Sequence, residues 1–274
     1  MANPQTPSDR DQLFSVRGRT AVVTGGSRGI GAMIAHGLVL DGAHVVISSR
    51  KADRCRGTAE AIAAEADSTG SGGTCDYVAA DLSTAEGVAQ LVAGVRERQE
   101  SLDVLVNNAG ATWGAPMESF PRSAWDRVLA TNLVSPFELA VGLLPLLRQA
   151  ATAQAPARIV NIGSIDGLRV PDPENYSYAA SKAGLHHLTR HLASRLAPDH
   201  ITVNAIAPGP FRTDMLRHIA ADPSLEQAML DRVPLRRYGD EDDIVGAVRF
   251  LVARSGSYLT GVVIPLDGGI SGHG

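Results

Sequence analysis

Two side chains in the run Tyr178-Ala-Ala-Ser-Lys182 have the types and the spacing for acid and base chemistry. If this run is helical, residues four apart lie about 40° apart around the axis, so the phenol and the ammonium group share one face. A neighbouring cation favours the phenolate and lowers the pKa of a tyrosine from its reference value of about 10. The spacing therefore predicts that Tyr178 is a general acid or base.

Tyr176 is a chemically identical alternative two residues away. It lies six residues before Lys182, and this separation corresponds to about 240° around a helix, so the two side chains cannot share a face. The spacing selects Tyr178. A Y-x-x-x-K pair also arises by chance on solvated helices, so the interpretation depends on the rest of the chain.

Near the start of the chain, a strand, a glycine-rich turn and a helix follow one another. Residues 20–24 form an apolar β-branched run, Gly25, Gly29 and Gly31 come next, and an apolar-periodic segment continues to residue 40. Glycines let the backbone approach a pyrophosphate, and a helix N-terminus supplies free N–H groups and a partial positive charge. A tight turn without a ligand would contain similar glycines. The prediction of a dinucleotide site therefore depends on the order strand, glycine-rich turn, helix.

The residues after the second expected strand, 43–48, indicate which cofactor would bind. NAD enzymes usually place an acidic residue here for the ribose 2′-hydroxyl, whereas arginine accommodates a 2′-phosphate. The acid is absent, and we predict that Arg50 and Arg28, with Ser27, Ser49 and Lys51, bind a phosphate. Alternatively, Arg50 and Lys51 are solvated residues that open a surface loop. The sequence favours NADP(H) over NAD(H).

The elements that must position these residues alternate between strand and helix. Strands are expected at residues 20–24, 43–48, 75–80, 102–106, 157–162, 201–206 and 262–269, and later helices at 53–67, 84–98, 123–147, 176–196 and 240–253. This alternation predicts a single α/β domain, doubly wound and Rossmann-type, with a roughly seven-stranded, mainly parallel sheet. We expect residues 1–16 to form a flexible tail, residues 17–274 the domain, and residues 208–234 a mobile cover.

Two groups of residues follow the third and fourth expected strands, at the edge where ligands of open α/β sheets collect. They are Asp81, Leu82, Asn107, Asn108, Ala109 and Gly110. Asp81 can contact an adenine or cap the next helix. Asn132 lies within an apolar helical pattern, where a buried amide without partners costs about 1–3 kcal/mol, so it is a candidate functional group.

Composition excludes several functional classes. The chain of 274 residues has 44% hydrophobic and 20% charged residues, and its net charge is −4 without a basic run. These values indicate a folded domain and no nucleic-acid partner. Two cysteines, no apolar run near the ~20 residues of a membrane span, and a polar start without a signal peptide predict a cytoplasmic protein without a membrane contact. His187 and His191 lack a third ligand, so no metal site is expected.

Together these motifs resemble the short-chain dehydrogenase/reductase family over about residues 17–270. The residues that carry the resemblance, in the family's order, are Thr24, Gly25, Gly29, Gly31, Asn107, Asn108, Ala109, Gly110, Asn132, Ser164, Tyr178, Lys182, Pro208, Gly209, Asp267, Gly268 and Gly269. Ser164 and Tyr178 are fourteen positions apart, one more than in most members. The sequences around residues 161–167 and 208–211 are similar to 3-oxoacyl-acyl-carrier-protein reductases, especially the branch associated with rhamnolipid synthesis.

The resemblance implies a role for each matching residue. Tyr178 would protonate the carbonyl that is reduced, Ser164 would hydrogen-bond the same oxygen, and Lys182 would lower the pKa of the tyrosine and hold the nicotinamide ribose. Asn132 would anchor a water that links Lys182 to solvent, and no metal is needed. The expected cofactor residues are Gly25, Ser27, Arg28, Gly29, Ile30, Gly31, Ser49, Arg50, Lys51, Asp81, Leu82, Asn108, Ala109, Gly110, Tyr178, Lys182, Pro208, Gly209 and Thr213.

The leading hypothesis is an NADPH-dependent carbonyl reductase that acts on a 3-oxoacyl thioester or a related β-keto compound. A second hypothesis is an alcohol dehydrogenase for a sugar, a steroid or another secondary alcohol, because the same site works in either direction. A hypothesis of a different class is a non-catalytic NADP(H)-binding protein. The resemblance also implies a homotetramer, or a dimer, formed through the helices at residues 123–147 and 176–196.

Overall fold

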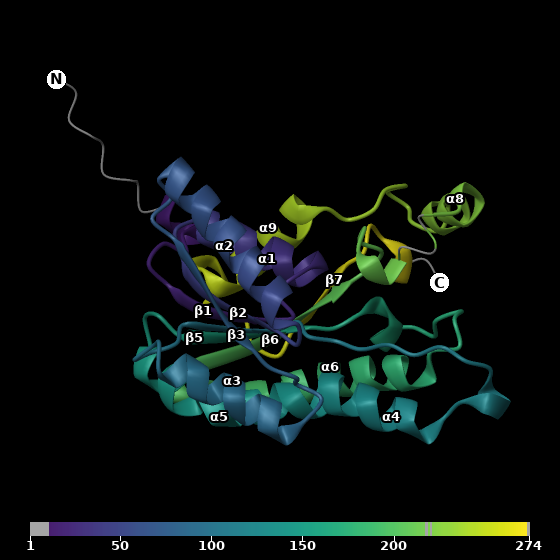
Figure 1. Cartoon of the computed structure of the whole chain (residues 1–274), viewed down its shortest axis with the longest axis horizontal. Coiled ribbons are helices and arrows are strands. Elements are labelled where there is room, and N and C mark those ends of the chain that lie inside the picture. Colours follow the sequence, from purple (N-terminus) through teal and green to yellow (C-terminus); the bar gives the residue numbers. More distant parts are fainter. Residues whose placement is uncertain (1–10, 217–218, 220, 273–274) are drawn as a thin grey trace.

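A sheet of parallel strands forms the centre of the molecule (Figure 1). The computed structural model describes residues 11–216, 219 and 221–272, and within them seven strands pair in the order β3-β2-β1-β4-β5-β6-β7. The strands are β1 Thr20–Thr24, β2 His44–Ser49, β3 Thr74–Ala79, β4 Val104–Asn107, β5 Ala157–Ile162, β6 Ile201–Pro208 and β7 Val263–Leu266. This topology confirms the predicted doubly wound Rossmann-type fold.

Helices cover both faces of the sheet. They are α1 Gly29–Leu40, α2 Ala52–Thr69, α3 Ala85–Arg96, α4 Arg122–Leu129, α5 Ser135–Ala150, α6 Tyr176–Leu196, α8 Pro223–Leu230 and α9 Glu241–Val252. Figure 1 shows α1, α2 and α9 on one face, and α3, α4, α5 and α6 on the other. Each layer has its own apolar core, one around Ile34 and Val248 and the other around Leu105 and Leu143. Because both faces are covered, β5 and β6 are buried along their whole length.

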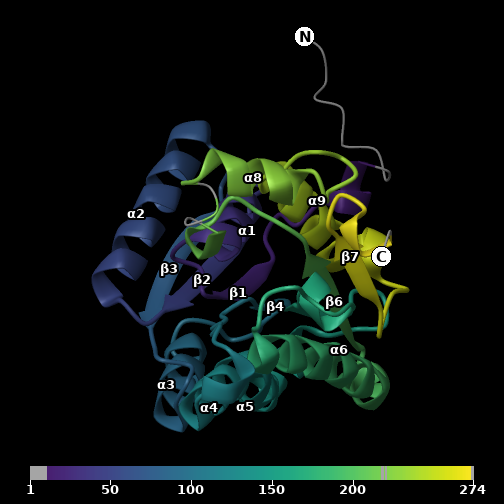
Figure 2. The ribbon, with the colours of Figure 1, turned by 90° about the vertical axis from the view of Figure 1, so that its right-hand side faces the viewer.

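The strand order reverses between β1 and β4, and such a reversal opens a crevice at the carboxyl ends of the two strands. Figure 2 faces this end of the molecule, where α8 crosses above the strands. The predicted cover of residues 208–234 contains α8, but its positions 217, 218 and 220 lie outside the described residues. The fold thus places the glycine turn, the end of β4 and the end of β5 around one crevice.

The predicted helical pattern of residues 123–147 corresponds to one long helical stretch of two helices and the turn between them. It runs from α4 through a π-helical turn, Ala130–Val134, into α5. The stretch Arg122–Ala150 is long and apolar enough to cross a membrane by length and composition, contrary to the expectation that no segment is. Here it packs in the fold, with α5 against α3 and α4 against α6, and core helices pass the same test.

The start of the chain differs from the predicted tail of residues 1–16. Residues 1–10 lie outside the described part. Asp11–Phe14 form a 3-10 turn, and Val16 is buried in the core on the α1 side. The folded part therefore begins before residue 17.

His36 joins α1 to α2 and α9 through two carboxylates. Its Nδ1 contacts Glu241, and its Nε2 lies 3.1 Å from a carboxylate oxygen of Glu65. Burial lowers the pKa of His36, but the hydrogen bonds and charges of Glu241 and Glu65 outweigh it, and the net pKa is raised above 6.5. When it is protonated, the imidazole therefore pairs with both carboxylates and links three helices.

This cluster is expected to stabilise the protein more at acidic than at alkaline pH. Because the folded pKa is raised, the contribution is complete below the unfolded pKa of about 6.5 and is lost as the pH rises through the folded value. His36→Gln should lower the free energy of unfolding by roughly 0.5–1 kcal/mol near pH 6 and much less near pH 9. Urea denaturation of both proteins at several pH values measures this difference, and a difference that does not change with pH would contradict the expectation.

Candidate active site

Ser164 begins the turn that follows β5. Its Oγ accepts a hydrogen bond from the Asp166 N–H at 3.1 Å, and this bond caps the 3-10 turn Ile165–Gly167. A hydroxyl that accepts one bond still has its own proton to donate, and a hydrogen bond from Ser164 acts on the Tyr178 oxygen. The end of β5 thus aims a hydroxyl donor at the phenol.

Tyr178 and Lys182 lie on one face of α6. The Lys182 Nζ is 5.6 Å from the centroid of the Tyr178 ring and donates a hydrogen bond of 2.8 Å to the Ile162 carbonyl. Tyr176 instead donates to Glu174 and packs edge-on against the Phe120 ring. The structure confirms that Tyr178, and not Tyr176, shares a face with the lysine; its catalytic role stays a prediction.

The pKa values differ from the sequence prediction. Burial raises the pKa of Tyr178 to about 12, the hydrogen bond from Ser164 opposes this rise, and the charge of Asp166 adds to it. Burial also lowers the pKa of Lys182 to about 8. The sequence predicted that Lys182 lowers the pKa of Tyr178. With only the protein's own groups around the phenol, this prediction is wrong. The ammonium faces the aromatic ring and a backbone carbonyl, and desolvation of the phenol dominates.

Asn132 is fully buried within the π-helical turn. Its Nδ2 donates to the Ala111 carbonyl and to Ser181 Oγ, each at 2.9 Å, and its Oδ1 accepts from the Ala111 N–H at 2.8 Å. These bonds satisfy the amide and connect the helix both to the loop after β4 and to α6. A Cβ built on Gly110 would lie 3.6 Å from Asn132 Oδ1 and 3.9 Å from Lys182 Nζ, so the backbone of Gly110 lies beside both.

The glycine turn is locked to the end of β4 by Asn108. Its side-chain amide donates to the Thr24 carbonyl at 2.9 Å and to the Gly25 carbonyl at 3.4 Å. A Cβ on Gly31 would lie 2.3 Å from this amide nitrogen and 2.4 Å from the Gly25 carbonyl oxygen, so a side chain does not fit there. Gly25 and Gly29 have positive φ, which L-residues with a side chain rarely adopt. The turn therefore needs glycine at these positions.

Arg28 and Arg50 occupy two different parts of the expected phosphate site. Arg28 precedes α1, and its guanidinium pairs with Asp214 at 2.9 Å. Arg50 is exposed after β2 and lies near Asp81. Burial raises the pKa of Asp81, but hydrogen bonds from Ser83 and the charges of Arg50 and Arg127 lower it overall.

Of the two roles considered for Asp81, an adenine contact and a helix cap, the structure contradicts the second. Thr84, and not Asp81, caps α3, because the Thr84 Oγ1 accepts from the Gly87 N–H. Asp81 instead accepts hydrogen bonds from the backbone N–H and the hydroxyl of Ser83. The carboxylate therefore orders the turn before the helix, and its contact with an adenine stays a prediction.

The remaining predicted cofactor residues also lie at this edge of the sheet. The Cγ2 of Thr213 is 3.2 Å from where a Cβ of Gly29 would be, so Thr213 lies over the glycine turn. Gly209 follows β6 and lies against Asp267, and its N–H donates to the Leu266 carbonyl at 2.9 Å. Ser27, Ser49, Lys51, Leu82, Ala109 and Pro208 lie at strand ends or in the segments that follow them, and Ile30 lies in the first turn of α1. The fold brings the predicted set together around the crevice.

The sequence prediction missed Arg54 and Asp214. Arg54 Nη1 lies 3.7 Å from the same Asp214 oxygen that pairs with Arg28. Neither residue belongs to a motif, and the only signal was that Asp214 follows Thr213. Within the described residues, no group of three or more His, Cys, Asp and Glu side chains is arranged to hold a metal ion.

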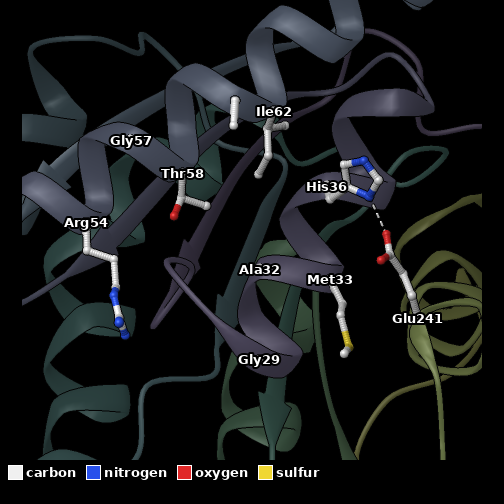
Figure 3. A pocket seen from close by; sticks show the side chains of 10 residues that line it. Gly29, Ala32, Met33, His36, Arg54, Gly57, Thr58, Ile62 and Glu241 are labelled. Carbon is white, nitrogen blue, oxygen red and sulfur yellow. Dashed lines mark hydrogen bonds and ion pairs between the residues drawn. The ribbon is translucent and has the colours of Figure 1, made fainter. Parts of the chain in front are cut away.

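A cavity of about 540 Å³ lies outside this crevice, between α1 and α2 (Figure 3). It is lined by Gly29, Ala32, Met33, His36, Arg54, Gly57, Thr58, Ala61, Ile62 and Glu241. Ser164, Tyr178 and Lys182 do not line it. The cavity is therefore separate from the candidate catalytic groups, and it adjoins the glycine turn, where Gly29 lines it and Thr58 donates to the Ser27 carbonyl at 3.2 Å.

Comparison with known protein sequences gives matches along nearly the whole chain. A family model described as enoyl-(acyl carrier protein) reductase matches residues 25–271. A rhamnolipids biosynthesis 3-oxoacyl-[acyl-carrier-protein] reductase of Pseudomonas aeruginosa is 46% identical over 256 residues, which are 93% of this chain and 97% of that protein. Gluconate 5-dehydrogenase of Gluconobacter oxydans is 33% identical over 263 residues, which are 94% and 97% of the two chains.

Solved structures agree with these sequence matches. The RhlG/NADP active-site complex of Pseudomonas aeruginosa superposes with a TM-score of 0.90 at 45% sequence identity. The superposition covers 95% of this chain and 99% of the Pseudomonas aeruginosa chain. A gluconate 5-dehydrogenase from Burkholderia cenocepacia, in complex with NADP and tartrate, gives a TM-score of 0.86 at 28% identity, with coverages of 96% and 99%. The likeness thus extends over the crevice as well as the sheet.

Proposed function

Since the chain belongs to the short-chain dehydrogenase/reductase family, we propose that it reduces a 3-oxoacyl thioester, or a related β-keto compound, with NADPH. It is an oxidoreductase of that family and uses NADP(H). The observation that carries the proposal is the arrangement of Ser164, Tyr178 and Lys182 at the carboxyl end of β5. The 3-oxoacyl substrate of the Pseudomonas aeruginosa relative supports the choice of ketone.

Tyr178 is the proton donor in this reaction. Its pKa of about 12 keeps the phenol protonated at neutral pH, so a proton is ready when negative charge develops on the carbonyl oxygen. Ser164 donates a hydrogen bond to the same oxygen, and Lys182 supplies positive charge beside the phenolate that remains. NADPH, when bound, supplies the hydride. Asn132 holds the loop after β4 and α6 in register, so that Lys182 stays beside Tyr178.

The crevice fits a dinucleotide phosphate. The glycine turn leaves no room for a side chain at Gly31, and the backbone there can approach a pyrophosphate closely. The N-terminus of α1 faces the same place and supplies free N–H groups. Arg28 and Arg50 would bind the 2′-phosphate. The relatives from Pseudomonas aeruginosa and Burkholderia cenocepacia are both solved with NADP, which supports this cofactor.

Arg50→Asp is expected to reverse the cofactor preference. The change removes a phosphate ligand and introduces a carboxylate that can accept from the ribose 2′-hydroxyl, so kcat/KM for NADPH should fall about 100-fold more than kcat/KM for NADH. Arg56→Asp makes the same charge change on the exposed face of α2, where Arg56 pairs with Asp53, and should leave the ratio unchanged. An unaltered ratio in Arg50→Asp would show that the phosphate is recognised elsewhere.

The substrate class is tested by following NADPH absorbance with a β-ketoacyl thioester and with a panel of cyclic ketones, sugar acids and secondary alcohols. The thioester should give the highest kcat/KM. A preference for sugar acids would support the dehydrogenase alternative, which the 33% identical gluconate 5-dehydrogenase favours. Tight NADPH binding without turnover of any carbonyl would support the non-catalytic alternative.

We also propose a cytoplasmic homotetramer. Val134, Phe137 and Val141 are exposed apolar residues spaced along one side of the α4–α5 stretch, which suits contact with a second copy. The cysteines Cys55 and Cys75 are free thiols, as expected in a reducing compartment.

A further inference from the structure

Three charged side chains from three elements meet at the glycine turn. Arg28 precedes α1, Arg54 lies in the first turn of α2, and Asp214 begins the 3-10 turn Asp214–Leu216 that follows β6. One oxygen of Asp214 lies 2.9 Å from the Arg28 guanidinium and 3.7 Å from that of Arg54. Figure 3 shows Arg54 projecting from α2 toward the end of the cavity at which Gly29 lies. One carboxylate therefore bridges two cations that are far apart in the sequence.

This bridge crosses the open side of the crevice. Thr213, next to Asp214, lies against Gly29, where the N-terminus of α1 would face a pyrophosphate. Figure 2 shows α8 at the end of the molecule where the strands have their carboxyl ends. A dinucleotide seated on the glycine turn would lie beneath residues 213 and 214, and it cannot leave on this side until they move.

The ends of the same stretch are fixed. Phe211 is 3% exposed and forms a backbone bridge with Gly239, whose N–H donates to the Pro210 carbonyl at 2.9 Å. Val233 packs with Ile165, next to the catalytic serine. Between these anchors, Asp214 is the described residue that pairs the stretch with the arginines before α1 and in α2.

We propose that Asp214 is a latch that keeps this stretch closed over the bound cofactor, so that its ion pairs set the rate of cofactor exchange. The proposal rests on the proposed NADP(H) site but not on the identity of the ketone. An arginine has five N–H donors, so Arg28 can hold Asp214 with one edge of its guanidinium while other N–H groups face a phosphate. Asp214 is thus a positioning residue: it touches the arginines and acts on the cofactor through them.

Asp214→Asn keeps the shape of the side chain and removes its charge. The dissociation rate of NADPH, measured by stopped-flow nicotinamide fluorescence with excess NADP⁺ as the competitor, should rise about threefold to tenfold, as expected for the loss of two part-exposed ion pairs. The association rate should change less. Asp231→Asn is the matched control, because Asp231 pairs with Arg236 on the same stretch at 2.6 Å. NADPH should dissociate from this variant at the same rate as from the unaltered protein.

Two further measurements separate a latch from a general loss of structure. Arg54→Gln should also speed NADPH release. The double variant Arg54→Gln/Asp214→Asn should release NADPH no faster than Asp214→Asn alone, because Asp214→Asn already removes the ion pair with Arg54. Higher ionic strength should speed release from the unaltered protein more than from Asp214→Asn.

An unchanged dissociation rate in Asp214→Asn would overturn the latch. Slower release with tighter binding would overturn it as well and would show that Asp214 competes with the cofactor phosphate for the two arginines. These binding rates need no ketone, so a failure of the latch is distinct from a failure of the proposed reduction. If the unaltered protein binds no NADPH, the proposed cofactor site fails, and the latch with it.

Discussion

Tyr178→Phe is expected to abolish ketone reduction and to leave NADPH binding nearly intact. The substitution removes the phenolic proton and leaves the ring over which Lys182 Nζ lies, so the geometry of the site should persist. Loss of a positioned proton donor should lower kcat by about 1000-fold or more. Turnover is followed by NADPH absorbance with a β-ketoacyl thioester, and binding by nicotinamide fluorescence.

Tyr176→Phe is the matched control for this prediction. Tyr176 lies two residues away but donates its hydrogen bond to Glu174, so its replacement should leave kcat within about twofold. Near-normal turnover in Tyr178→Phe would rule out the assignment of the proton donor. Equal losses in both variants would indicate damage to the start of α6 rather than to the chemistry.

Gly31→Ala is expected to weaken NADPH binding by about 100-fold, because displacement of a binding element by about 1 Å has effects of that order. The added methyl would lie 2.3 Å from the Asn108 amide nitrogen and 2.4 Å from the Gly25 carbonyl oxygen. Neither atom can remain in place, so the turn must separate from the end of β4. Fluorescence titration with NADPH measures the loss of affinity.

Gly57→Ala provides the comparison for Gly31→Ala. Gly57 lies in α2, where a Cβ would meet no atom within 4 Å, so alanine should stabilise the helix by about 0.5–1 kcal/mol and leave the affinity unchanged. Unaltered affinity in Gly31→Ala would contradict the proposed role of the glycine turn. Thermal denaturation of both variants shows whether a loss of affinity comes from unfolding.

The sequence predicted β1, β5 and α6 with the bounds that the structure shows. Strands covered on both faces are continuous apolar runs, and the Y-x-x-x-K spacing depends only on helix geometry, so both signals are local. The π-helical turn Ala130–Val134 escaped prediction, because one added residue per turn hardly changes an apolar pattern.

Properties that depend on three-dimensional surroundings could not be predicted in the same way. The Tyr178 pKa follows from burial and from Asp166, whereas the sequence showed only the lysine four residues on. Arg28 and Asp214 are 186 positions apart, and no local pattern connects them. His187 and His191 attracted attention by their spacing, yet both are exposed, while His186 is the buried one, and burial lowers its pKa to about 4.

The backbone bridge between Phe211 and Gly239 joins the two ends of the stretch that lies between them. Its two ends stay together whatever lies between them, and the entropy of closing a loop changes only slowly with its length. New lengths can therefore be inserted there as long as Val233 keeps its contact with Ile165, which lies next to Ser164 in the turn after β5. Exchange of this stretch between relatives, with the site around Ser164, Tyr178 and Lys182 kept, would measure how far it determines which ketone is accepted.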